Sequence, residues 1–199
     1  MSVSRLSKQS IQTGFPKQQT VWDQSTSVAG MDAIGSVVLT SNQTSVTFSN
    51  VPSTYTHLQV RGTFLGNGTV TCYINLNSDS TSGNYSFHGI RRNTTVFNSY
   101  GTTSSTTFQI GTVWGATATY PAIFIADILD YTNTNKYKTM RCLSGVEDNG
   151  GSNSGIEFNS AMWSKAGSGT TSPIVTTVTV SINGSGALPG SQFSLYGVK

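Results

Sequence analysis

Apolar and polar residues alternate with a period of two over most of the chain, and this alternation predicts β-strands with one buried face. The cleanest repeat runs over 174–182, and residues 57–65 and 69–77 show it as well. Turn-forming residues separate these stretches at short intervals, and we expect no helix. The side chains expected to face the interior of the two earlier stretches are Leu58, Val60, Gly62, Phe64, Val70, Cys72, Ile74 and Leu76.

The most apolar part of the chain predicts a hairpin between Tyr120 and Leu143. A strand over 122–131 leads into a turn rich in Asn and Thr, and a second strand covers 137–143. We expect this hairpin to form the centre of an all-β, jelly-roll-like sandwich of two sheets. An immunoglobulin-like topology is the alternative, but the chain lacks the Cys…Trp…Cys spacing typical of that fold.

About ten strands are predicted from the alternation and the turn signals. Residues 93–105 lack the pattern, and we expect them to form a loop that holds an exposed Tyr100. The expected strands cover 34–39, 44–48, 57–65, 69–77, 85–92, 106–114, 122–131, 137–143, 156–163, 174–182 and 192–198.

The N-terminal part of the chain differs from the rest, because it is rich in Gln, Ser and Thr and its apolar residues follow neither strand nor helix periodicity. Gly14 and Pro16 interrupt any helix there. We therefore divide the chain into an extended arm over 1–33 and a sandwich domain over 34–199. The apolar residues of the arm, expected to contact a partner, are Leu6, Ile11, Phe15, Val21, Trp22, Val28 and Met31.

The arm is not expected to become ordered alone. Burial of its anchors would contribute on the order of 10–20 kcal/mol, whereas fixing about 33 backbones costs on the order of 30–60 kcal/mol. Fully extended, the arm reaches roughly 110 Å, which is enough to cross a neighbouring subunit. A partner protein is therefore the expected location of the arm.

Composition and charge exclude several classes of function. Charged residues make up 10% of the chain, the net charge is +3, and no basic stripe occurs. Nucleic-acid-binding domains usually have such a stripe, so we expect no contact with DNA or RNA. No apolar run is long enough to span a membrane, and the N-terminus lacks the apolar core of a secretory signal.

Few side chains have the arrangement that catalysis requires. Cys72 and Cys142 are expected to be buried free thiols rather than a disulfide. Asp127 and Asp130 lie on the apolar strand of the hairpin, where a carboxylate can serve as an acid or base. The structural interpretation, which we favour, pairs Asp127 with Arg141 or a lysine and places Asp130 at the start of the turn.

The remaining candidates are weaker. His57 and His88 are expected to be surface imidazoles. The loops at 77–84 and 147–153 contain the oxygen ligands that calcium prefers, although ordinary turns have the same composition. We expect no enzymatic activity, no cofactor and no resident metal. Flat faces for a sugar ring, or more commonly for a core or an interface, are offered by Tyr100, Trp114, Tyr131 and Trp163.

Four phrases, in order along the body, carry a family resemblance: PSTYTHLQVRGTF at 52–64, NSDSTSGNYSFHG at 77–89, DILDYTNTNKYKTMR at 127–141 and FSLYGVK at 193–199. They resemble a family of tailed-phage virion proteins that includes capsid decoration (cement) proteins, head fibres and tail-fibre modules. The arm is not covered. The resemblance implies a non-enzymatic virion component, usually a β-sandwich that forms trimers, and it transfers no catalytic residue.

Two roles follow as expectations. In the first, the protein is made in the host cytoplasm, sits on the outer surface of the capsid, and clamps neighbouring major capsid proteins with its arm. In the second, it is a head- or tail-fibre module that binds a host surface glycan and uses the arm as an anchor. The chain shows neither shaft repeats nor a coiled coil, which favours the cement role.

Overall fold

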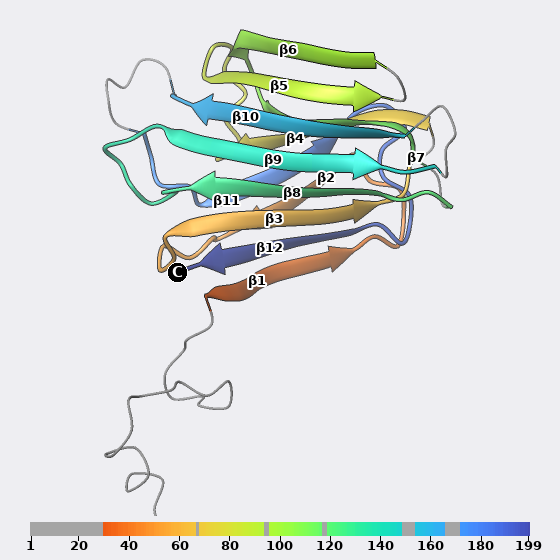
Figure 1. Cartoon of the computed structure of the whole chain (residues 1–199). Coiled ribbons are helices and arrows are strands. Elements are labelled where there is room, and N and C mark those ends of the chain that lie inside the picture. Colours follow the sequence, from red (N-terminus) through yellow and green to blue (C-terminus); the bar gives the residue numbers. More distant parts are fainter. Residues whose placement is uncertain (1–29, 67, 94–95, 117–118, 149–153, 166–171) are drawn as a thin grey trace, which may run out of the picture. The chain divides into compact units, whose positions relative to one another are not determined.

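The computed structural model describes residues 30–66, 68–93, 96–116, 119–148, 154–165 and 172–199. These residues form an all-β sandwich, which confirms the predicted fold class (Figure 1). The strands are β1 (Met31–Val38), β2 (Ser45–Ser49), β3 (His57–Phe64), β4 (Gly68–Leu76), β5 (Tyr85–Asn93), β6 (Val96–Ser105), β7 (Phe108–Ala116), β8 (Ala122–Leu129), β9 (Lys138–Val146), β10 (Gly155–Trp163), β11 (Thr177–Ile182) and β12 (Gln192–Val198).

The strands build two antiparallel sheets of unequal size. The large sheet has eight strands in the order β1-β12-β3-β8-β9-β10-β5-β6, and the small sheet has four in the order β2-β11-β4-β7. Figure 1 shows the small sheet behind the large one. The predicted hairpin corresponds to β8 and β9, which lie in the middle of the large sheet.

The core fills the space between the two sheets. On β3 and β4 the alternation acts as predicted, because the residues expected to face inward are buried. Burial of each large apolar side chain contributes roughly 1.5–3 kcal/mol before the entropic cost of ordering is counted. The largest fully buried apolar side chains are Trp163, Tyr85, Tyr131, Phe64, Phe108 and Phe193.

The sandwich begins earlier than the sequence pattern predicts. Strand β1 starts at Met31, three residues before the expected boundary at Ile34, and Met31 pairs with Val198 on β12. Backbone hydrogen bonds to β12 extend the sandwich to Met31, although buried and exposed side chains do not alternate regularly along β1. The expected boundary at residue 33 therefore cuts through the first strand.

Two further differences concern strand limits. The expected loop at 93–105 is largely strand β6, which pairs along its length with β5. Tyr100 is half-buried rather than exposed, because its ring turns toward the sandwich. The clean repeat at 174–182 begins as a strand only at Thr177, and Ile174 lies before it with a partly exposed side chain. No helix that could cross a membrane occurs in the described ranges.

Candidate binding groove on the large sheet

The outward face of the large sheet has an unusual distribution of apolar residues. On β10, Phe158 points outward and is 50% exposed, whereas Glu157 points inward and is 1% exposed. Strands β5, β6, β8 and β9 also place large apolar side chains on this face. The exposed set is Ile90, Phe97, Ile123, Ile125, Leu143, Ile156, Phe158 and Met162.

Strand register arranges this face into rows that cross the sheet. Residues that face one another on the neighbouring strands β8, β9, β10, β5 and β6 line up in rows across the sheet. One such row is polar, and the next row on the same face is apolar. The polar row is Asp127, Arg141, Ser160, His88 and Gly101, and the apolar row is Ile125, Leu143, Phe158, Ile90 and Ser99. A groove of about 920 Å³ follows these two rows.

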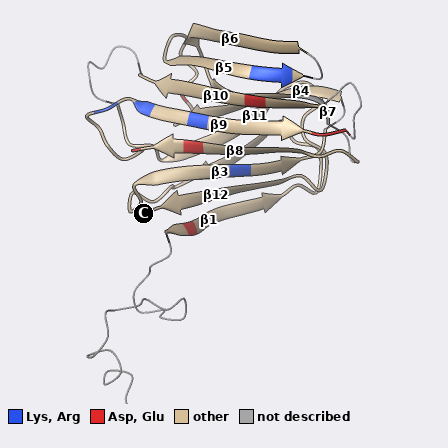
Figure 2. Ribbon diagram, viewed as in Figure 1, with Lys and Arg blue, Asp and Glu red and all other residues tan. Residues whose placement is uncertain are grey.

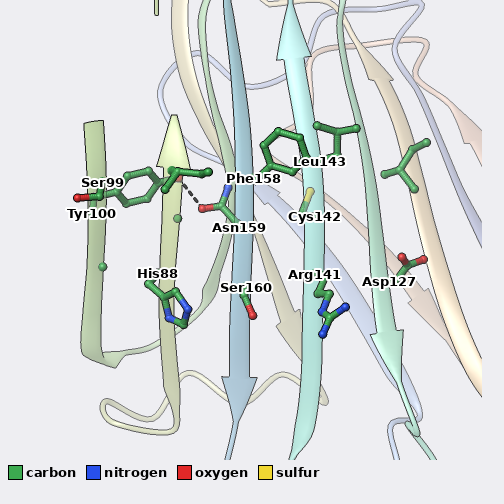
Figure 3. Close-up of a pocket in the computed structure, with 14 residues that line it drawn as sticks. His88, Ser99, Tyr100, Asp127, Arg141, Cys142, Leu143, Phe158, Asn159 and Ser160 are labelled. Carbon is green, nitrogen blue, oxygen red and sulfur yellow. Dashed lines mark hydrogen bonds between the residues drawn. The ribbon is translucent and has the colours of Figure 1, made fainter. Parts of the chain in front are cut away.

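Figure 3 shows the side chains of the polar row lying along one line across the strands, with Phe158 and Leu143 on one side of it. At its β6 end the groove is lined by the small residues Ser99 and Gly101. Figure 2 shows that charged residues are scattered over this sheet rather than gathered into one patch. The groove therefore has an apolar wall, a polar wall and little net charge.

The two charged residues of the groove do not form the ion pair expected from the sequence. Asp127 and Arg141 are directly opposite in register. However, Asp127 Oδ1 accepts a hydrogen bond of 2.7 Å from Gln59 Nε2 on β3. Within the described part of the chain, no carboxylate lies within 4.0 Å of the Arg141 guanidinium. Arg141 thus has no ion-pair partner among the described residues, and the neighbouring carboxylate is held by Gln59.

A buried polar cluster lies directly beneath the groove. The Tyr100 hydroxyl is 2.8 Å from Glu157 Oε2 and 2.5 Å from Asn159 Oδ1, and it donates to these acceptors. The backbone N–H of Thr112, on the small sheet, donates to Glu157 Oε2 at 3.0 Å. Asn159 Nδ2 donates to the carbonyl of Ile110 at 3.1 Å. These hydrogen bonds join β6, β10 and β7, and thus connect the two sheets.

The cluster depends on a glycine and on a cation. A Cβ at Gly89 would lie 2.1 Å from Asn159 Oδ1 and 2.9 Å from Tyr100 Cζ, so only glycine lets Tyr100 pass over β5 to β10. The Arg91 guanidinium packs on the Tyr100 ring at 5.1 Å and approaches Glu157 Oε1 at 4.0 Å. Burial, with the nearby Glu157 carboxylate, raises the pKa of Tyr100 well above its ordinary value, so the hydroxyl keeps its proton.

Other predicted candidates have structural roles. Cys72 and Cys142 are free and buried, as predicted, and burial raises the pKa of both thiols. Asp130 begins the turn, as predicted, with a φ of 49°, and Lys136 Nζ lies 3.3 Å from its Oδ2. His57 Nδ1 accepts a hydrogen bond of 3.0 Å from the backbone of Asp130.

The loop at 77–84 uses its carboxylate internally. Trp163 Nε1 and Asn84 Nδ2 donate to Asp79 Oδ2, and the backbone of Thr81 donates to Oδ1. Burial raises the pKa of Asp79, but these hydrogen bonds outweigh it, so the pKa lies below its ordinary value. Part of the loop at 147–153 lies outside the described residues.

The expected arm contacts remain largely outside the described residues, which include only Met31. Arg61 Nη2 donates to Met31 Sδ at 3.5 Å, and Met31 is part of β1. Of the aromatic candidates, Trp163 and Tyr131 are fully buried, Tyr100 turns inward, and the side chain of Trp114 lies outside the described set. Leu6, Ile11, Phe15, Val21, Trp22 and Val28 lie outside it as well.

Sequence reasoning missed Glu157 and Phe158, and it expected Tyr100 to be exposed rather than to donate into a buried cluster. The sequence shows the apolar repeat of Ile156, Phe158 and Met162 on β10. Such a repeat normally faces the core, whereas here it faces outward. The signal that could have revealed this is the terminal Trp163, which shares a face with Glu157 rather than with Phe158. Comparison with protein-family models, with curated proteins and with solved structures gives no match for this chain.

Proposed function

We propose that this protein is a non-enzymatic structural component of a phage virion, a cement protein on the outer surface of the capsid. One observation carries the proposal. Phe97, Ile123 and Ile156, here called the apolar rim, share one register row near one end of the large sheet, with Gly145 and Arg92 between them, and have exposed fractions of 67%, 58% and 45%. Together with the other exposed apolar side chains of this face, they form the kind of surface that monomeric proteins rarely expose and that subunits of assemblies use.

In this proposal the rim and the arm have different partners. The rim packs against further copies of the chain, in the trimers that the family resemblance implies. The arm reaches major capsid proteins and clamps them to one another. Sparse charge on the large sheet supports this division, because an uncharged surface loses little solvation when a neighbour covers it.

Deletion of residues 1–29 tests the clamp. The truncation stops before β1, since removal of Met31 to Ala33 would also destroy pairing with β12. The shortened protein is expected to keep its fold and to lose binding to capsids that lack it, measured by co-sedimentation. Unchanged binding of the truncated protein to capsids would refute the clamp.

The rim is tested separately with the full chain. The double variant Phe97→Ser, Ile156→Ser is expected to shift the protein to monomers in native mass spectrometry while leaving the arm intact. Ile174→Ser, at a partly exposed apolar site away from the large sheet, is the matched control and should not change the mass of the assembly. An unaltered assembly in the double variant would exclude the rim as its contact.

A second candidate function is a head- or tail-fibre module that binds a host surface glycan. The groove favours it, because the groove combines exposed polar side chains with an aromatic ring. The copy number on the virion separates the two functions. Hundreds of copies per particle would support the cement role, and about a dozen would support the fibre role.

A further inference from the structure

We propose that the groove over β8, β9, β10, β5 and β6 binds a linear saccharide that carries carboxylate groups. The groove occupies different rows from the apolar rim, so this inference does not depend on the cement role; it rests on and narrows the glycan-binding function proposed above as the second candidate. From β8 to β5 the walls of the groove differ in character, with apolar side chains on one side and hydrogen-bonding side chains on the other, and at β6 the two rows end in Ser99 and Gly101. A ligand that fits must itself have an apolar face and a polar edge.

The shape of the groove favours a thin, extended ligand. It crosses five adjacent strands, from Asp127 on β8 to Gly101 on β6, which corresponds to about 19 Å at the usual strand spacing. A flat protein surface laid over these rows would leave part of the 920 Å³ groove empty. A chain of linked pyranose rings has the required width and length.

Arg141 selects the charge of the ligand. The guanidinium is exposed, and no carboxylate of the described residues lies within 4.0 Å of it. Its planar array of donors matches a carboxylate with two parallel hydrogen bonds. Ser160 and His88 continue the polar row away from Asp127, and both side chains can donate. A ligand carboxylate therefore belongs on the Ser160 side of Arg141, where Asp127 does not repel it.

Asp127 complements this cation as an acceptor for ligand hydroxyls. Gln59 holds Oδ1, and Oδ2 makes no hydrogen bond to any described residue. An ionised carboxylate only accepts hydrogen bonds, so it pairs well with the vicinal hydroxyls of a pyranose. The order of the polar row thus predicts hydroxyl recognition on β8 and carboxylate recognition between β9 and β5.

Phe158 supplies the apolar contact. Half of its surface is exposed, and Leu143 and Ile90 flank it in register. The C–H groups on one face of a sugar ring form an apolar surface that packs on an aromatic ring. Beneath it, the hydrogen bonds among Tyr100, Asn159 and Glu157 fix β10 and β6, so the groove is organised before the ligand arrives.

The test titrates the full-length protein with tetragalacturonate and, separately, with neutral maltotetraose, by calorimetry in 0.15 M salt. Tetragalacturonate is expected to bind and maltotetraose is not. Arg141→Met should weaken binding at least about tenfold, because it removes a hydrogen-bonded charge pair. Phe158→Ala should weaken it several-fold. Far-ultraviolet circular dichroism confirms that both variants remain folded.

Two matched control variants lie on the same face but outside the groove. Arg92→Met and Phe97→Ala remove a cation and an aromatic ring there, and each should change the dissociation constant less than twofold. Failure of tetragalacturonate to bind would overturn the proposal, as would equal binding of maltotetraose. An equal loss in Arg92→Met would show non-specific attraction of charge, and it too would overturn the assigned site.

Discussion

The two faces of strand β10 reverse the usual order of an amphipathic strand. Its inward residues include Glu157, Asn159 and Trp163, whereas its outward residues include Ile156 and Phe158. Glu157 Oε2 and Asn159 have hydrogen-bond partners on β6 and β7, and the Arg91 guanidinium lies 4.0 Å from Glu157 Oε1, which makes no hydrogen bond among the described residues. The outward apolar side chains Ile156 and Phe158 remain 45% and 50% exposed. The inner face therefore serves folding, and the outer face is available for binding.

The largest expected effect comes from truncating one aromatic residue on each face of β10, which tests whether the inner face serves folding and the outer face does not. Trp163 is fully buried, stacks on Tyr85 and donates to Asp79. Trp163→Ala should reduce the free energy of unfolding by about 3–5 kcal/mol, as for other large core truncations. Phe158→Ala should reduce it by less than about 1 kcal/mol, because Phe158 is half-exposed. Urea unfolding measures both, and equal losses would contradict the assignment of the faces.

A smaller effect is expected from the buried carboxylate. Glu157→Ala removes the acceptor for the Tyr100 hydroxyl and the Thr112 N–H, and should cost about 3 kcal/mol in the free energy of unfolding. Glu157→Gln keeps an acceptor oxygen and should cost measurably less. Amide hydrogen exchange should show that the alanine variant exposes β6 first. If both variants are as stable as the wild type, the cluster does not hold β6.

The smallest predicted effect is a dependence of stability on pH that originates in Asp79. Its pKa is lower in the folded protein than the ordinary value of 3.8. The ionised carboxylate therefore stabilises the folded protein. This contribution to the free energy of unfolding is complete at a pH above the ordinary pKa, and it is lost as the pH falls through the lower pKa of the folded state. Wild-type stability should decrease below about pH 4, and Asp79→Asn should show a shallower decrease. Thermal unfolding from pH 6 to pH 2.5 compares the two, and parallel curves would exclude Asp79.

Much of the fold could be predicted from local patterning. Strands β3 and β4 were correctly placed because each buries one face against the other sheet, which enforces strict alternation. Strand β6 was missed because it forms an edge of the large sheet and pairs with β5 on one side only. Backbone pairing defines it, and residues such as Thr102 and Ser104 carry no periodic signal.

The candidate site was harder to predict, because it depends on which face of a strand points outward. The repeat of Ile156, Phe158 and Met162 indicates a strand but not its orientation. Asp127 and Arg141 face each other in the strand register, as expected, but their side chains do not form the expected ion pair. Gln59 reaches Asp127 from a strand 68 residues earlier in the sequence, and hairpin reasoning does not include that neighbour.

The position of β12 has a consequence for the order of synthesis. Strand β12 lies between β1 and β3, and among the described strands β1 pairs with β12 alone. Strand β1 therefore has no neighbour among the described strands until β12 has been synthesised. Loss of β12 would leave both β1 and one side of β3 without these hydrogen-bond partners. Strand edges exposed in this way invite aggregation, so the sheet is protected only once β12 is in place.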